Sequence, residues 1–126
     1  MKQVLLIDDD RDDAELFKEA LFEINPSIGF EHYQDSKEGL QILLRKTTDL
    51  PDLIFLDINM PIISGWQCLT EFRKAEHLKN IPVIMFTTSS QPREKELAQE
   101  LGAQGFITKA SEYKALKDSI SSVIKN

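Results

Sequence analysis

Short apolar runs alternate along this chain with longer stretches in which apolar residues recur every three or four positions. Continuous runs occur at Val4–Ile7, Leu53–Leu56 and Val83–Phe86, a shorter one occurs at Gly105–Thr108, and Phe30–Tyr33 alternates between apolar and polar residues. Continuous apolar runs bounded by polar residues are typical of parallel strands covered on both faces. The alternating segment favours a strand at the sheet edge.

Amphipathic helical patterns occupy the intervals between these strands. The first helix is expected to end at Asn25-Pro26, and Ser36 is positioned to cap the second. Pro92 fits the start of the fourth helix and Gly102 its end. The predicted apolar faces are Ala14, Phe17, Leu21 and Ile24; Leu40, Leu43 and Leu44; Trp66, Leu69 and Phe72; Leu97, Ala98 and Leu101; and Tyr113, Leu116, Ile120, Val123 and Ile124.

The predicted order of elements is therefore βαβαβαβαβα. Strict alternation indicates a parallel sheet with helices on both faces, because crossovers between parallel strands are right-handed. Five strands favour an α/β, flavodoxin-like (βα)5 three-layer sandwich with strand order 2-1-3-4-5. No linker or repeat interrupts residues 1–126, so we expect a single domain.

Composition narrows the possible partners. The chain has 126 residues and a net charge of −6, from 15 Lys and Arg against 21 Asp and Glu. Nucleic-acid phosphates and anionic membranes repel an acidic domain, so neither is an expected partner. Cys68 is the only cysteine, which excludes an intrachain disulfide. No apolar run has the length of a membrane span and no signal peptide is recognisable, so a cytoplasmic location is expected.

Candidate chemistry lies directly after the central strands. The first strand is followed by Asp8–Asp10, the third by Asp57, the fourth by Thr87 and the last by Lys109. Parallel strands bring these residues to one edge of the sheet. Crowded carboxylates require a counter-charge, and hard oxygen ligands suit Mg²⁺. A carboxylate can also accept a phosphoryl group, with a metal ion and a lysine neutralising the charge.

Four segments resemble the receiver domains of two-component signalling. They are Val4–Asp10, Asp52–Pro61 followed by Gly65, Val83–Thr88 and Gly102–Lys109, and together they span essentially the whole chain in the family's order. The resemblance implies a signalling switch rather than an enzyme: a protein that catalyses only its own phosphorylation and slow dephosphorylation. The opening DDDRDDAELF is also similar to small regulators partnered with phytochrome-type kinases.

Residue roles follow from this resemblance position by position. Asp57 matches the phosphoacceptor. The direct ligands of Mg²⁺ (or Mn²⁺) match Asp9, Asp57 and the backbone carbonyl of Asn59, while Asp8 matches the acid that acts through a metal-bound water. Three further positions complete the family's machinery: Thr87 as the switch hydroxyl, Lys109 as the phosphate contact and Phe106 as the aromatic ring that rotates inward.

Other polar residues favour structural roles. Asp10 fits the N-cap of the first helix, and Asp12 and Asp13 fit acids of its first turn that favour the helix dipole. His32 and His77 have no partner residues at ligand spacing, so solvated or structural positions are expected for both.

Two positions depart from the common receiver pattern. Ala110 follows Lys109 where proline is usual, and a cis bond before alanine costs about 3–4 kcal/mol. Either this peptide is trans with a shifted loop, or local contacts hold a strained cis bond. Phe106 lacks the hydroxyl of the tyrosine often found there, so it cannot donate a switch hydrogen bond.

Three alternatives to a phosphorylated switch fit the sequence less well. A haloacid-dehalogenase-like phosphatase would use an aspartate after the first strand, but it needs further acids beyond Lys109. A flavodoxin-type flavin binder needs a Ser/Thr/Gly-rich phosphate loop, and DDDRDD would repel that phosphate. A pseudo-receiver binding module normally lacks one of the acids or the lysine, all of which this chain keeps.

The resemblance also implies partners. A histidine kinase or a histidine phosphotransfer protein would donate the phosphoryl group. A downstream protein would bind the face formed by the fourth helix, the fifth strand and the fifth helix. We expect a monomer or a dimer promoted by phosphorylation.

Overall fold

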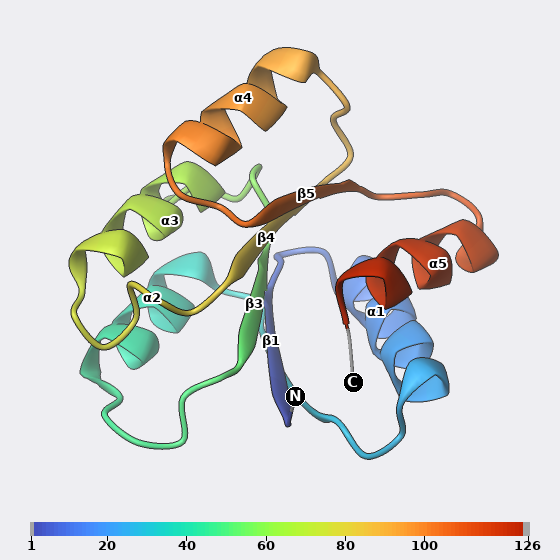
Figure 1. Ribbon diagram of the computed structural model, residues 1–126, viewed down its shortest axis with the longest axis horizontal. Helices are drawn as coiled ribbons and strands as arrows, with labels where there is room; N and C mark the ends of the chain where they lie inside the picture. Colours follow the sequence, from blue (N-terminus) through green and yellow to red (C-terminus); the bar gives the residue numbers. More distant parts are fainter. Residues whose placement is uncertain (1, 125–126) are drawn as a thin grey trace.

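Five strands alternate with five helices along residues 2–124, the part of the chain that the computed structural model describes (Figure 1). The strands are β1 (Gln3–Ile7), β2 (Gly29–Tyr33), β3 (Leu53–Leu56), β4 (Val83–Thr87) and β5 (Gly105–Thr108). The helices are α1 (Arg11–Ile24), α2 (Ser36–Arg45), α3 (Gly65–Lys74), α4 (Pro92–Glu100) and α5 (Tyr113–Val123). Every predicted element is present, and Thr87 forms the last residue of β4 instead of following it.

The sheet has the predicted strand order. Its neighbouring strands are all parallel and run β2-β1-β3-β4-β5, with β2 at one edge as its alternating sequence indicated. α1 and α5 lie together on one face of the sheet, and α2, α3 and α4 cover the other (Figure 1). This arrangement is the flavodoxin-like three-layer fold.

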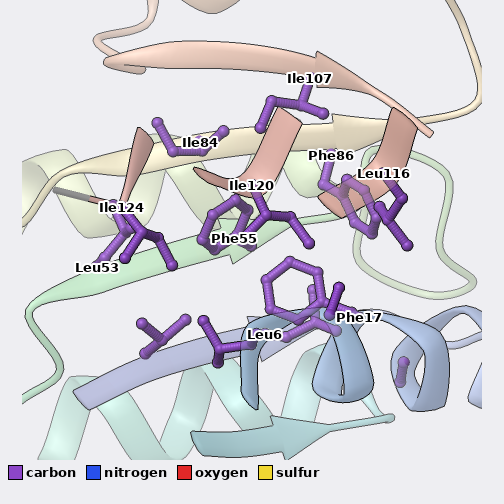
Figure 2. Close-up of a cluster of buried hydrophobic side chains, with 14 of the residues drawn as sticks. Leu6, Phe17, Leu53, Phe55, Ile84, Phe86, Ile107, Leu116, Ile120 and Ile124 are labelled. Carbon is purple, nitrogen blue, oxygen red and sulfur yellow. The ribbon is translucent and has the colours of Figure 1, made fainter. Parts of the chain in front are cut away.

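Aromatic rings fill the core between the sheet and the α1–α5 layer. Figure 2 shows Phe17 of α1 packed against Phe55 of β3 and Phe86 of β4. The ring centroid of Phe17 lies 4.7 Å from that of Phe55 and 5.5 Å from that of Phe86, both in edge-to-face geometry. The alternate strand residues, including Leu5 and Ile54, pack on the opposite face. Burial on both faces explains why the central strands are continuously apolar.

Carboxylates cap the first two helices. Asp10 accepts hydrogen bonds from the backbone N–H groups at the start of α1, which confirms its predicted capping role. The prediction for α2 was wrong by one residue, because Asp35 and not Ser36 is the N-cap. The Ser36 side chain is instead buried, and its hydroxyl donates to the Pro61 carbonyl at 3.2 Å.

Helix ends elsewhere follow the predicted residues. Asn25 is the C-cap of α1, and Pro92 occupies the first turn of α4. Gly102 has a φ of 94°, the left-handed conformation that glycine adopts without strain after a helix. Among the described residues, no helix has both the length and the apolar character required to cross a membrane.

Candidate functional site

Asp8 and Asp57 lie side by side because the sheet pairing continues one residue beyond β1 and β3. The Asp57 N–H donates to the Ile7 carbonyl at 2.9 Å, and the Asp8 N–H donates to the Tyr33 carbonyl at 3.2 Å. Both side chains are buried, with Asp8 fully enclosed. The Asp10 N–H also donates to Asp8 Oδ1 at 2.9 Å, which fixes the carboxylate orientation.

Three carboxylates converge at this edge of the sheet. One oxygen each from Asp8, Asp9 and Asp57 lies within 4.8 Å of the other two. Asp9 and Asp57 line a cleft of about 620 Å³, and Asp8 lies enclosed beside them. The other lining residues are Asp10, Arg11, Asp12, Asp13, Asn59, Thr88 and Lys109. Oxygen ligands grouped in this way have the chemistry that Mg²⁺ or Mn²⁺ requires. The cleft therefore combines a candidate metal centre with access for a small substrate.

Lys109 supplies the positive charge at the centre of the cluster. Its ammonium nitrogen lies 2.9 Å from Asp8 Oδ2, 2.9 Å from Asp13 Oδ2 and 3.7 Å from Asp57 Oδ1. The Lys109 side chain is only 9% exposed. It also lies over the Phe86 ring, with Nζ 5.1 Å from the centroid. A buried ammonium surrounded by acids is well placed to contact an anion at Asp57.

The pKa values of Asp57, Asp8 and Lys109 reflect the excess of acidic over basic side chains at the site. Burial, reinforced by the negative charge of Asp8, raises the pKa of Asp57 to about 7. Burial also raises the pKa of Asp8, although its hydrogen bond from the Asp10 N–H opposes the shift. Burial disfavours the charged form of Lys109, but its bonds to Asp13 and Asp8 outweigh that effect and raise its pKa. One ammonium therefore serves several carboxylates.

Thr87 ends β4 at the same edge of the sheet but is not among the residues that line the cleft. Its side chain is fully buried, and its hydroxyl oxygen accepts a weak hydrogen bond from the Ser89 N–H at 3.4 Å. The neighbouring Thr88 lines the cleft. The Thr87 carbonyl accepts from the Lys109 N–H, so β4 also holds the backbone of the lysine.

Phe106 of β5 is partly buried against the core layer that includes α4. The ammonium of Lys95 lies 5.9 Å from its ring centroid. The question raised by Ala110 is answered, because the described residues contain no cis peptide bond. The Lys109–Ala110 peptide is therefore trans, and Lys109 still reaches the acids.

A glycine is required directly behind the phosphoacceptor candidate. A Cβ atom on Gly65 would overlap the backbone carbonyl of Asp57. The Gly65 N–H donates to the Ile58 carbonyl at 2.9 Å, which closes the β3–α3 loop. This close approach explains the glycine that follows the Asp57–Pro61 motif, and it leaves Asn59 at the cleft wall.

The role of Asp13 at the site was missing from the sequence prediction. Asp13 does lie in the first turn of α1 as expected, yet it also binds Lys109. Helical side chains lean toward the helix N-terminus, which here points to the strand ends. This direction of the side chain was the signal that could have placed Asp13 at the site. The two histidines have structural roles: His32 Nε2 lies 2.7 Å from the Asp8 carbonyl, and His77 Nε2 lies 2.9 Å from the Leu43 carbonyl.

Sequence comparisons identify the family. The model of the response regulator receiver domain matches residues 4–121. The chain is 32% identical to the chemotaxis protein CheY of Halobacterium salinarum over 98% of its own length and 97% of that protein. It is 31% identical to the transcriptional regulatory protein CpxR of Klebsiella pneumoniae but covers only 50% of it. It covers 26% of a probable cyclic di-GMP phosphodiesterase of Vibrio cholerae, at 28% identity.

Solved structures agree with these matches. The phosphorylated cyanobacterial phytochrome response regulator RcpA superimposes with a TM-score of 0.87 at 27% identity, over 97% of this chain and 90% of that one. The Mn²⁺-bound response regulator Rcp1 gives a TM-score of 0.86 at 27% identity, over 98% and 91%. The chain therefore belongs to the response regulator receiver domains of two-component signalling systems.

Proposed function

We propose that this chain is a phosphoacceptor switch in which Asp57 receives a phosphoryl group from the phosphohistidine of a partner. The observation that carries this proposal is the placement of Asp57, a buried carboxylate on the wall of an open cleft, beside Lys109. Asp8 and Asp9 adjoin it closely enough to share a cation. These are the groups that phosphoryl transfer to a carboxylate needs.

The acid cluster fits a divalent cation. Lys109 contacts Asp8 Oδ2 as an ion pair, but this buried oxygen has no aligned hydrogen-bond partner among the described residues. Such an oxygen, in a carboxylate beside two others, can accept a hydrogen bond from a metal-bound water. Asp9, Asp57 and the Asn59 carbonyl would hold Mg²⁺ or Mn²⁺ directly, and Asp8 would act through that water. When bound, the cation neutralises charge on the carboxylates and on the phosphoryl oxygens.

Asp57 is the nucleophile of the transfer. One of its carboxylate oxygens forms the new O–P bond as the N–P bond of the phosphohistidine breaks. The leaving imidazole nitrogen keeps the electron pair of that bond and takes a proton from solvent. Lys109 binds the phosphoryl oxygens, which balances the charge gained at Asp57.

Thr87 and Phe106 would convert the new charge into a change of shape. The Thr87 hydroxyl, buried next to the site, would donate to a phosphoryl oxygen. Phe106 would then rotate inward, as its partial burial beside α4 permits. The phosphoryl group thereby favours one of two pre-existing states, because only that state offers it these contacts.

The partners follow from the family. A histidine kinase or a histidine phosphotransfer protein supplies the phosphoryl group, and a downstream protein binds the face formed by α4, β5 and α5. The likeness to RcpA and the opening DDDRDDAELF support a kinase of the phytochrome type. We further propose that residues 1–126 act in the cytoplasm as a single receiver domain, monomeric or dimeric upon phosphorylation, without binding nucleic acid or membranes.

Phosphorylation by a small donor tests the proposal. The purified protein is incubated with acetyl phosphate and excess Mg²⁺, and its intact mass is measured. A gain of one phosphoryl group is expected for the parent, with loss of that gain in Asp57→Asn or in EDTA. A parent that gains no phosphoryl group would refute the switch and favour the pseudo-receiver. An equal gain of mass in the parent and in Asp57→Asn would refute Asp57 as the acceptor.

A further inference from the structure

Asp13 binds the same ammonium that the phosphoryl group would need. Asp13 belongs to the first turn of α1, whereas Lys109 follows β5, 96 residues further along the chain. The hydrogen bond from Lys109 Nζ to Asp13 Oδ2 is 2.9 Å long. This contact ties the start of α1 to the end of β5 across the mouth of the site.

Phosphoryl oxygens at Asp57 would compete with three carboxylates for the donors of Lys109. An ammonium group carries three N–H donors. In this structure Asp8 and Asp13 each lie 2.9 Å from it, whereas Asp57 lies 3.7 Å away and outside hydrogen-bond distance. The ammonium therefore lies closer to Asp8 and Asp13 than to the residue where new negative charge would appear.

Resting on the proposed function, we infer that Asp13 is a competing counter-ion that restrains Lys109 in the unphosphorylated state. Phosphorylation of Asp57 then requires the ammonium to shift its contacts from Asp13 toward the phosphoryl oxygens. Asp13 thereby lowers the rate at which Asp57 is phosphorylated, and it couples the first turn of α1 to the state of the site.

Burial shows why Asp13 is the partner that gives way. Asp8 is fully buried and Asp57 nearly so, and both are less accessible to bulk water than Asp13. The Asp13 side chain is 33% exposed, so water can solvate its carboxylate once Lys109 leaves. Breaking the Asp13 contact is therefore the least costly rearrangement of the three.

Asp12 provides a matched control. It is the preceding residue of the same helical turn, carries the same charge and lines the same cleft. Its side chain is exposed, and within residues 2–124 the ion pairs of Lys109 involve Asp8, Asp13 and Asp57 instead. Asp12→Asn therefore removes one negative charge from the cleft without releasing the ammonium.

The first test compares phosphorylation rates with acetyl phosphate at saturating Mg²⁺. Asp13→Asn is expected to be phosphorylated about threefold to tenfold faster than the parent, since it frees one donor of a partly buried ion pair. Asp12→Asn should stay close to the parent rate, and Asp13→Glu, which keeps the charge, should return toward it. Equal rates for Asp13→Asn and Asp12→Asn would overturn the inference, as would a slower Asp13→Asn.

A second test needs neither metal nor phosphate. Urea unfolding in EDTA is measured for Asp13→Asn, for Lys109→Met and for the double variant. The effects on the unfolding midpoint should be non-additive for this pair and additive for Asp12→Asn combined with Lys109→Met. Additive effects for the Asp13 pair would overturn the inference. Failure of the parent to accept a phosphoryl group would instead overturn the proposed function.

Discussion

Replacing Asp57 with asparagine should stabilise the metal-free protein while abolishing the proposed phosphorylation. The Asp57 side chain is 7% exposed, and burial raises its pKa to about 7 from 3.8. One pKa unit corresponds to about 1.4 kcal/mol, so the shift places an upper limit of roughly 4 kcal/mol on the gain in unfolding free energy at alkaline pH. The attraction to Lys109, 3.7 Å away, already opposes this shift, and solvent screening at the cleft reduces the expected gain to about 2–3 kcal/mol.

The gain in unfolding free energy of Asp57→Asn depends on pH, and the pKa shift of Asp57 determines the direction of that dependence. Between pH 3.8 and about 7, folded Asp57 holds a proton that the unfolded chain has released. The folded parent binds more protons in this window, so its stability falls as the pH rises and becomes constant above the folded pKa. Asparagine does not titrate. The advantage of Asp57→Asn should therefore increase with pH by up to about 1.4 kcal/mol per unit and level off above about pH 7.

Urea unfolding followed by circular dichroism in EDTA, at several pH values from about 5 to about 8, measures this difference. Asp118→Asn is the control, because this exposed acid of α5 pairs only with the exposed Lys114 among the described residues. Its effect should stay below about 1 kcal/mol at every pH. The reasoning is refuted if Asp57→Asn is no more stable than the parent at about pH 8, or if the difference is the same at about pH 5.

Three further outcomes are expected. Mg²⁺ at a hundredfold excess over its Kd should raise the unfolding free energy of the parent by about 2.7 kcal/mol, and that of Asp9→Asn by much less at the same concentration; an equal gain would contradict the cation assignment. Phe17→Ala should lower the unfolding free energy by about 3–5 kcal/mol, since the ring is fully buried against those of Phe55 and Phe86; a loss below about 1 kcal/mol would argue against its central packing. Burial raises the pKa of Cys68 to about 12, so its thiol should react with a disulfide reagent slowly in buffer and rapidly in urea; fast reaction of the folded protein would contradict this burial.

The layered fold and the edge of the sheet that carries chemistry could be predicted from the sequence. Strands buried on both faces need continuous apolar runs, and each run here ends at the residue where its strand ends or directly before it. Parallel topology then brings Asp8, Asp57 and Lys109 to one edge wherever their loops lead. Asp10 was also predictable, because capping depends only on the backbone immediately after it.

Contacts between distant side chains were decided by the tertiary structure alone. Asp35 and Ser36 are both acceptable caps, and in the tertiary structure Asp35 caps the helix while the Ser36 hydroxyl donates to the Pro61 carbonyl. The pairing of Asp13 with Lys109 depends on how α1 and the end of β5 are oriented across the sheet. Hydrophobic periodicity is a local property that specifies which face of an element is buried. The direction of a charged side chain, and hence its partner, is set by packing among elements far apart in the sequence.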